Sequence, residues 1–328
     1  MEMALLGNMA LFLVGFAVEM GWLAFGGDGS GADDTNADTT DTDTLDPDVA
    51  MPPVSQENAP EASFDQSLFA TMANGTDLPE EIAAEPTDGA VALFGYDGND
   101  NVLGGDLNDW LEGDGGNDIL LGNGGDDVLW GGTGDDDLYG LNGNDTLHGG
   151  AGHDLLEGNV GEDYLYGFDG DDTLAGGGGL DTLIGGAGND ALMSDRADAQ
   201  ADYTRGMGDK LDGQDGDDRL IFTNGDVVLG GVGQDLMQFM VQNGVENIAR
   251  LDDFSPSEDT LQIIYDPIYD DAGQEIVPTL SFVIAADQNA TLVYMNDIPI
   301  AGSSGTVTNT STIELVPQSS DFYDGIGR

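Results

Sequence analysis

The chain has 328 residues, of which 64 are Asp or Glu and 6 are Lys or Arg, so its formal net charge is −58 at pH 7. A surface this acidic repels nucleic acid and anionic lipid, and neither is expected as a partner. Cysteine is absent, which excludes disulfides, thiol catalysis and thiolate metal sites. The basic residues begin at Arg196, so the many carboxylates before it need another source of positive charge.

The N-terminal region, residues 1–25, is predicted to be an apolar helix. Met3–Val18 is apolar except for Asn8, and the apolar pattern resumes after Glu19. Met3–Phe25 is long enough to cross a membrane if Glu19 lies at an interface. The basic amino end of a secretory signal peptide is missing. Two interpretations stay open, a membrane anchor and an apolar helix that packs on a partner or on the rest of the chain.

Residues 26–86 are predicted to be a disordered acidic linker. The region begins GGDGSGADDTNADTTDTDTLDPD and continues as a stretch rich in Pro, Glu and Ala. Low hydrophobicity with charge of one sign cannot offset the entropy of ordering, so the linker should repel itself and extend. A cation site on the alternating Asp and Thr residues is disfavoured because nothing fixes its geometry.

A nine-residue repeat dominates residues 87–238. From Gly95 the chain reads GYDGNDNVL, GGDLNDWLE, GDGGNDILL and eight more nonapeptides without interruption as far as Met193. Position one is always Gly, position six is always Asp, and position eight is Leu in every copy but the first. After a ten-residue interruption, weaker copies continue to Gln238. The candidate metal-ligating residues are the position-six aspartates: Asp100, Asp109, Asp118, Asp127, Asp136, Asp145, Asp154, Asp163, Asp172, Asp181, Asp190, Asp209, Asp218 and Asp235.

Each nonapeptide predicts a glycine-rich turn followed by a short strand with one inward leucine. Such a strand is too short to be stable alone, so the copies must stack. If two strands and two turns make one coil, a coil takes about 18 residues, and coils stack at the strand spacing of about 4.8 Å. About eight coils would then form a rod of roughly 40 Å around a thin leucine core.

Stacking also places the position-six aspartates in columns, and this arrangement calls for a cation. Two bare carboxylates about 4.8 Å apart repel by roughly 1 kcal/mol in water and by several times more near a dielectric of 20. Carboxylates and turn carbonyls offer an all-oxygen site, which suits Ca²⁺ better than Mg²⁺. Zinc would need Cys or His, and His148 and His153 occupy other positions of the repeat. Calcium is therefore the predicted ion, with folding and binding coupled.

The units match the pattern G-G-x-G-x-D-x-U-x, so the chain resembles the RTX, or hemolysin-type, calcium-binding family. The resemblance implies a parallel β-roll that holds roughly nine or more Ca²⁺ ions between the turns of repeats i and i+2. It also implies type I secretion of an unfolded chain, with an uncleaved C-terminal signal and folding outside the cell. The segment IARLDDFSPSEDTLQI (residues 248–263) resembles the one that often follows such arrays. The type I secretion machinery is thus an expected partner, and the expected location is extracellular or the cell surface.

Residues 239–328 are predicted to be a β-rich C-terminal cap that carries the secretion signal, because short apolar runs alternate there with turn residues. The expected fold class is therefore all-β: a calcium-binding parallel β-roll of nonapeptide repeats with a β-rich C-terminal cap, preceded by an apolar helix and a disordered acidic linker.

Three functions are compatible with this organisation. The favoured one is a calcium-binding extracellular or cell-surface structural or interaction protein, whose surface ligand the sequence does not identify. A pore-forming or bacteriocin-like toxin would use Met3–Phe25 as its inserting helix, but one apolar segment without basic residues makes a weak pore. An RTX hydrolase is less favoured because HExxH and GxSxG are absent. His153 beside Asp154 lies at a variable position where exposure is expected, so no catalytic residue and no enzyme activity is predicted.

Overall fold

The computed structural model describes residues 65–84, 89–194, 208–241, 249–255 and 257–265, and six short strands between residues 268 and 317. The chain divides into two compact units, Met1–Pro60 and Glu61–Arg328, and all described residues belong to the second. The expected apolar helix, residues 1–25, lies outside the described residues. Within them, the helical structure is a 3₁₀ turn at Gln66–Leu68, and no helix has the length and hydrophobicity needed to span a membrane.

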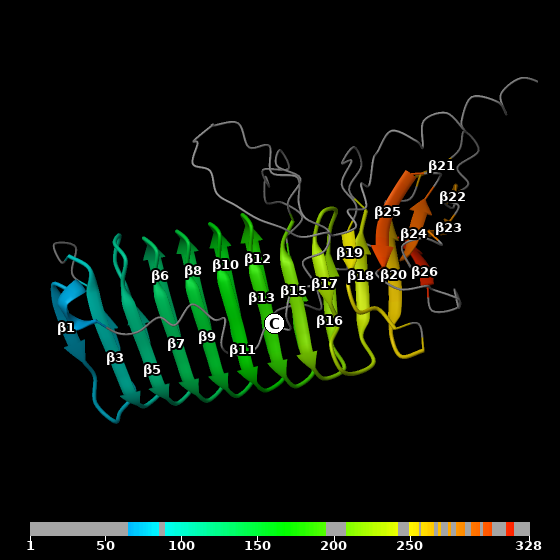
Figure 1. The fold of residues 1–328 in the computed structure, drawn as a ribbon. Helices are drawn as coiled ribbons and strands as arrows, with labels where there is room; N and C mark the ends of the chain where they lie inside the picture. Colours follow the sequence, from blue (N-terminus) through cyan, green and yellow to red (C-terminus); the bar gives the residue numbers. More distant parts are fainter. Residues whose placement is uncertain are drawn as a thin grey trace, which may run out of the picture. The chain divides into compact units, whose positions relative to one another are not determined.

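Two long sheets face each other, and the chain alternates between them (Figure 1). The first sheet contains, in spatial order, β1 (Thr71–Asn74), β3 (Val91–Asp97), β5 (Trp110–Gly115), β7 (Val128–Thr133), β9 (Thr146–Ala151), β11 (Tyr164–Asp169), β13 (Thr182–Ala187), β15 (Lys210–Asp215), β17 (Val227–Leu229), β19 (Ala249–Leu251), β25 (Ile298–Ser303), β24 (Ala290–Met295) and β23 (Leu280–Ala285). The second sheet contains β2 (Glu81–Ala83), β4 (Asn101–Leu103), β6 (Ile119–Gly124), β8 (Asp137–Asn142), β10 (Leu155–Val160), β12 (Thr173–Gly178), β14 (Ala191–Met193), β16 (Arg219–Phe222), β18 (Leu236–Met240), β20 (Thr260–Tyr265) and β26 (Ile313–Pro317). A separate pair joins β21 (Ile268–Tyr269) to β22 (Glu275–Ile276).

The register confirms the predicted coil of two strands and two turns. Leu147 pairs with Leu165, and Leu138 pairs with Leu156, so each repeat lies beside the repeat two further along. The ladders are parallel from β1 to β19 and from β2 to β26. The interruption after β14 leaves this register intact, because Leu183 on β13 still pairs with Leu211 on β15. The repeats thus form a parallel β-roll.

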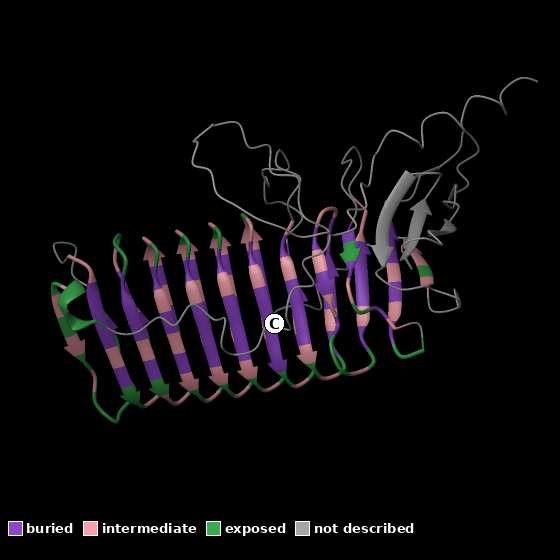
Figure 2. Ribbon diagram, in the orientation of Figure 1, coloured by how far each residue is buried: buried purple, intermediate pink, exposed green. Residues whose placement is uncertain are grey.

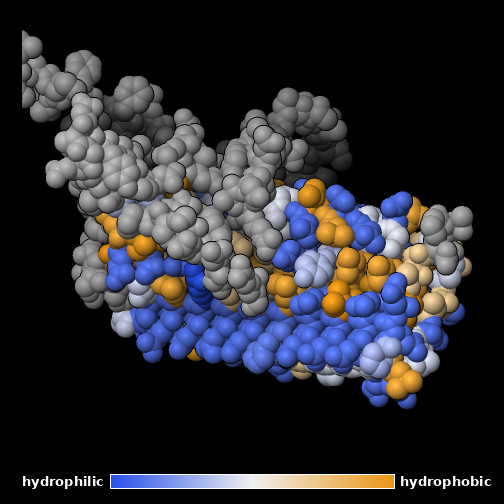
Figure 3. Space-filling model, turned by 180° about the vertical axis from the view of Figure 1, so that it is seen from behind, coloured by the Kyte–Doolittle hydropathy of each residue, from blue (hydrophilic) through white to orange (hydrophobic). Residues whose placement is uncertain are grey.

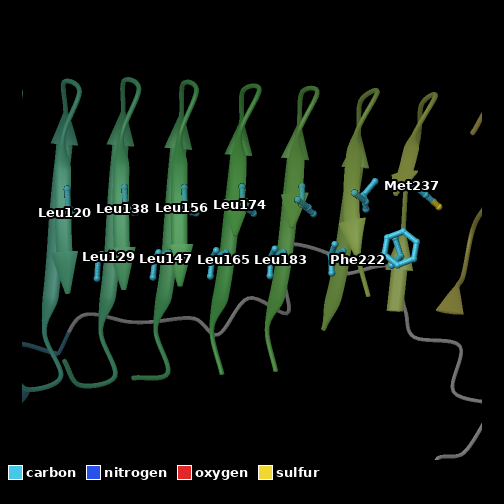
Figure 4. Packing of buried hydrophobic residues seen from close by; sticks show 14 of the residues in the cluster. Leu120, Leu129, Leu138, Leu147, Leu156, Leu165, Leu174, Leu183, Phe222 and Met237 are labelled. Atoms are coloured by element: carbon cyan, nitrogen blue, oxygen red, sulfur yellow. The ribbon is translucent and has the colours of Figure 1, made fainter. Parts of the chain in front are cut away.

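The core is a double row of leucines between the two sheets. Figure 4 shows Leu120, Leu138, Leu156 and Leu174 in one row and Leu129, Leu147, Leu165 and Leu183 in the other. All eight are fully buried, and the buried stripe follows the middle of the strands (Figure 2). Toward the C-terminal coils, Met237 takes the position of leucine, and Phe222 and Phe239 add a second inward residue to their strands in the same cluster. A core only one side chain thick per strand leaves much of the chain's stability to the turns.

The turns require glycine where successive coils touch. Gly152 has a φ of 145°, and a Cβ added to it would overlap the carbonyl oxygen of Gly134 in the preceding coil. Position four of the repeat is therefore glycine for two reasons, its backbone conformation and its lack of space. The turns form a continuous hydrophilic band along one long edge of the roll (Figure 3).

The ladders extend beyond the repeat motif at both ends. β1 and β2 lie within the range expected to be linker, yet they pair in parallel with β3 and β4. At the other end, β20 and β26 continue the second sheet past residue 238. A coil needs one inward apolar residue per strand, such as Ile82 in β2, and this can be met without the glycine and aspartate signature. Antiparallel pairing of β23, β24 and β25 ends the first sheet.

Candidate calcium sites

The position-six aspartates form two columns, each placed where a turn ends and a strand begins. All fourteen predicted residues are 1 to 3% exposed. One column leads into the strands of the second sheet and contains Asp100, Asp118, Asp136, Asp154, Asp172, Asp190, Asp218 and Asp235. The other leads into the strands of the first sheet and contains Asp109, Asp127, Asp145, Asp163, Asp181 and Asp209.

One oxygen of each carboxylate holds the coils together. The backbone N–H of Asp136 donates to Oδ1 of Asp154 at 2.9 Å, and the N–H of Asp154 donates to Oδ1 of Asp172 at 2.8 Å. The same bond recurs along both columns at 2.8 to 3.0 Å. Oδ1 thus accepts a hydrogen bond from the preceding coil, which leaves Oδ2 to face the turn.

In most of these residues Oδ2 is buried and accepts no hydrogen bond. We call them the open aspartates: Asp100, Asp118, Asp127, Asp136, Asp145, Asp154, Asp163, Asp172, Asp190, Asp218 and Asp235. A buried carboxylate oxygen without a partner is costly, and its regular repetition along the columns fits a series of cation-binding sites.

The space beside each open oxygen is kept clear by the glycine at position one. A Cβ added to Gly149 would lie 2.5 Å from Oδ2 of Asp154 and 2.9 Å from the carbonyl oxygen of Gly167. At Gly131 the corresponding distances are 2.5 Å to Oδ2 of Asp136 and 2.6 Å to the oxygen of Gly149. A carboxylate of repeat i and a carbonyl of repeat i+2 therefore converge on one point. This all-oxygen pocket fits Ca²⁺, which prefers carboxylate and carbonyl ligands.

Nowhere in the described residues do three or more His, Asp or Glu side chains gather at one point suited to a metal ion. The candidate sites accordingly depend on backbone carbonyls for much of their ligand set. His148 and His153 lie outside both columns, as the repeat predicts. His153 is exposed, and its Nδ1 accepts the N–H of Asp171 at 3.0 Å.

The electrostatics of the columns also favour a cation. The pKa of Asp127 and Asp190 is raised to about 8, chiefly by burial and also by nearby carboxylates, against the lowering effect of a hydrogen bond from the preceding coil. The same causes raise the pKa of Asp136 and Asp154 to about 7. Without a counter-ion the charged form is therefore disfavoured in the folded roll.

Two aspartates that the sequence analysis missed continue the columns. Oδ1 of Asp226 accepts the N–H of Asp209, and Oδ1 of Asp259 accepts the N–H of Asp235 at 3.3 Å. Their Oδ2 atoms differ from the open ones, because Asp226 accepts the N–H of Thr223 and Asp259 accepts the N–H of Ser255. Asp109, near the other end, similarly accepts the N–H of Gly105 at 2.6 Å. We call these three the capped aspartates.

A sequence signal for Asp226 existed in the spacing. It lies 17 residues after Asp209 and precedes the inward Val228, but the segment lacks the glycines of the repeat. Asp259 precedes the inward Leu261 in the same way. The pattern Asp-x-apolar alone is too common to single out either residue.

Comparison with known proteins agrees with this geometry. The family model of the RTX calcium-binding nonapeptide repeat matches residues 87–111, 94–129, 103–138, 130–165, 166–198 and 208–229. The match confirms RTX calcium-binding nonapeptide repeats in residues 87–198 and 208–229, as the sequence pattern predicts.

Two further comparisons add little. The solution structure of the AlgE6R3 subunit from the Azotobacter vinelandii mannuronan C5-epimerase is 18% identical, over 56% of this chain and 79% of that chain, with a TM-score of 0.17. A similarity this low does not support any argument about the fold, which follows from the strand pairing described above. Comparison with curated proteins gives no match.

Proposed function

We propose that this chain is a calcium-binding extracellular or cell-surface protein with a structural or interaction role, and that its roll folds on binding Ca²⁺ after export. The observation that carries the proposal is the repeated buried Oδ2 of the open aspartates, each beside a glycine that keeps space for an ion. A roll that is stable without bound ions would not need this arrangement of buried carboxylates.

Different residues of the chain would bind the ion and form the core. The open aspartates and the position-one glycine carbonyls, for example Asp154 and Gly167, would hold the ion, and the position-eight leucines would pack once the coils are in register. Bound calcium supplies positive charge, which reverses the repulsion within each column. Because the leucine core is thin, the unfolded chain is the expected state where calcium is scarce.

Export by the type I secretion machinery is the favoured route. A chain with no cysteine and a formal charge of −58 suits passage in an unfolded state from a low-calcium cytosol to a calcium-rich exterior. The RTX match supports this route by family resemblance. No enzyme activity is proposed, because the sequence motifs HExxH and GxSxG are absent.

The test is a calcium titration of the full chain followed by far-UV circular dichroism, with magnesium as the control. We expect little ordered structure in chelator and a cooperative gain of β signal at about 10⁻⁴–10⁻³ M calcium, the range of extracellular modules. Magnesium at the same concentrations should give much less. A β spectrum that chelator does not change would refute the proposal.

A further inference from the structure

The first coil of the roll carries a divergent copy of the nonapeptide repeat. Residues 75–83 read GTDLPEEIA, with Gly75 at position one, Glu80 at position six and Ile82 at position eight. Ile82 belongs to the leucine core, and β2 pairs with β4 in the register of the repeats. This coil lies at the end of the roll that β1 marks in Figure 1. It differs from the other coils because a glutamate stands where they have the metal-ligating aspartate.

The backbone of Glu80 continues the aspartate column of the second sheet. Its N–H donates to Oδ1 of Asp100 at 2.7 Å, as the N–H of Asp100 donates to Oδ1 of Asp118 at 2.8 Å. The carbonyl of Glu80 accepts the N–H of Asn101 at 2.9 Å, and the carbonyl of Asp100 accepts that of Ile119 at 2.8 Å. Glu80 therefore lies one coil before Asp100 and at the same position of its coil.

The space that we assign to an ion in the other coils is present here too. A Cβ added to Gly75 would lie 3.0 Å from Oε2 of Glu80 and 2.6 Å from the carbonyl oxygen of Gly95. A Cβ added to Gly95 would lie 2.8 Å from Oδ2 of Asp100 and 2.7 Å from the carbonyl oxygen of Gly113. The carboxylates of Glu80 and Asp100 thus face the same kind of space.

The two carboxylates differ in their hydrogen bonds. Oε2 of Glu80 accepts the N–H of Thr76 at 3.0 Å, and Oε1 accepts the hydroxyl of the same threonine. Oδ2 of Asp100 is buried and accepts no hydrogen bond. Glu80 is therefore satisfied by its own turn, whereas Asp100 is not.

The same closure occurs at two of the capped aspartates. Oδ2 of Asp109 accepts the N–H of Gly105, and Oδ2 of Asp259 accepts the N–H of Ser255, in each case from the residue four positions earlier. The donor to Glu80 is also the residue four positions earlier. In the open aspartates no amide donates to Oδ2. A backbone N–H four residues before the carboxylate is therefore a shared feature of these three column ends.

We propose that Glu80 closes the column of the second sheet in place of an ion, so that the first calcium of this column is held at Asp100. Glu80 would bind no calcium itself, because an ion at its carboxylate would compete with both hydrogen bonds from Thr76. The inference rests on the proposed function, since it assumes that the open aspartates bind calcium.

Burial also separates Glu80 from the open aspartates. Glu80 is half-buried, whereas Asp100 is 1% exposed. Burial raises the pKa of Asp100, the N–H of Glu80 lowers it, and the charge of the Glu80 carboxylate raises it. An ion at Asp100 would therefore offset a cost of burial that is smaller at Glu80.

Calcium counting by native mass spectrometry of the full chain tests the proposal. Glu80→Ala removes the carboxylate, and its matched control, Glu81→Ala, removes the same charge from the next residue, which is exposed. In saturating calcium both variants should keep as many ions as the parent chain, whereas Asp100→Asn should lose at least one. Hydrogen exchange of residues 71–84 should become about tenfold faster in Glu80→Ala alone, because the N–H of Thr76 loses its acceptor.

Loss of an ion in Glu80→Ala but not in Glu81→Ala would overturn the proposal, unless the exchange data show that the whole first coil has opened. In that case Glu80→Gln decides, because it keeps the volume and one acceptor oxygen. Retention of every ion in Glu80→Gln supports closure by Glu80, and loss of one ion would make Glu80 a ligand.

Unchanged exchange in Glu80→Ala would also overturn the proposal, since the carboxylate would then not hold the turn. A parent chain that binds no calcium at saturation would instead refute the proposed function, whatever the variants do.

Discussion

The aspartates in the middle of the columns and those at the ends occupy equivalent positions in their coils, but their Oδ2 atoms differ in hydrogen bonding. In the middle, Oδ2 of Asp154 is buried without a hydrogen-bond partner beside the space that Gly149 keeps clear. At three of the four ends, Oδ2 of Asp109, Asp226 and Asp259 accepts a backbone N–H. At the fourth end, Oδ2 of Asp100 is open like those in the middle. A carboxylate at this position therefore either leaves Oδ2 available to an ion or uses Oδ2 to accept a backbone N–H from a loop. The difference indicates that the interior of the roll depends on calcium, whereas three of the four column ends are closed by backbone amides.

The largest expected effect comes from filling the space meant for the ion. Gly149→Ala would place a methyl 2.5 Å from Oδ2 of Asp154, which adds about 1–3 kcal/mol of overpacking to the loss of an ion. Gly124→Ala is the control, because the nearest atom to its added Cβ is 3.8 Å away. Thermal melts in saturating calcium should show a clearly lower midpoint for Gly149→Ala alone. Similar midpoints for both variants would mean that the space is not used.

Neutralising one aspartate of each kind sharpens the comparison. Asp145→Asn keeps an oxygen for the N–H of Asp127 but removes charge from an open Oδ2, so at least one calcium ion should be lost. Asp226→Asn breaks the bond from Thr223 and should cost about 1–3 kcal/mol without loss of an ion. Native mass spectrometry at saturating calcium counts the ions, and denaturant unfolding gives the stability. Equal ion counts in the two variants would contradict the distinction between open and capped aspartates.

Protons should replace calcium in part. In the folded roll without calcium, the pKa is raised to about 8 for Asp127, about 7 for Asp154 and about 6 for Asp172, from 3.8, chiefly by burial. The folded chain thus binds more protons than the unfolded one, and its stability falls as pH rises through 6 to 8. In chelator, circular dichroism should show more β structure at pH 5 than at pH 8. Size-exclusion chromatography must exclude aggregation, and a pH-independent spectrum would contradict the electrostatic account.

The smallest effect is expected on the outer rim of the turns. His153 takes the place that Asn or Asp occupies in neighbouring coils, where a side-chain acceptor receives the N–H of the next coil, as Asn117 does for Asp135. His153→Asn should therefore change the free energy of unfolding by less than about 0.5 kcal/mol. A large loss of stability or of bound calcium would mean that His153 does more than accept this one hydrogen bond.

The repeated part of the fold could be predicted because its period is fixed. A position-six aspartate and a position-eight leucine in strict register leave one way to stack the coils, and Leu147 beside Leu165 follows from it. The ten-residue interruption does not disturb this prediction, since the pairing of Leu183 with Leu211 resumes the register.

The ends of the roll could not be predicted in the same way. β1 and β2 carry no glycine and aspartate signature, and Asp226 and Asp259 lie in segments whose turns are formed by other residues. Periodicity does not identify coils of this kind, because they share with the repeats only an inward apolar residue in each strand.

The central claim is that the interior of the roll is held by calcium. Hydrogen exchange of the full chain, followed by mass spectrometry in calcium and in chelator, tests it most directly because it reads each coil separately. The account predicts strong protection of the coils between Asp118 and Asp190 in calcium and rapid exchange of the same amides in chelator. Slow exchange of these coils in chelator would show that the roll stands without ions, and the account would be wrong.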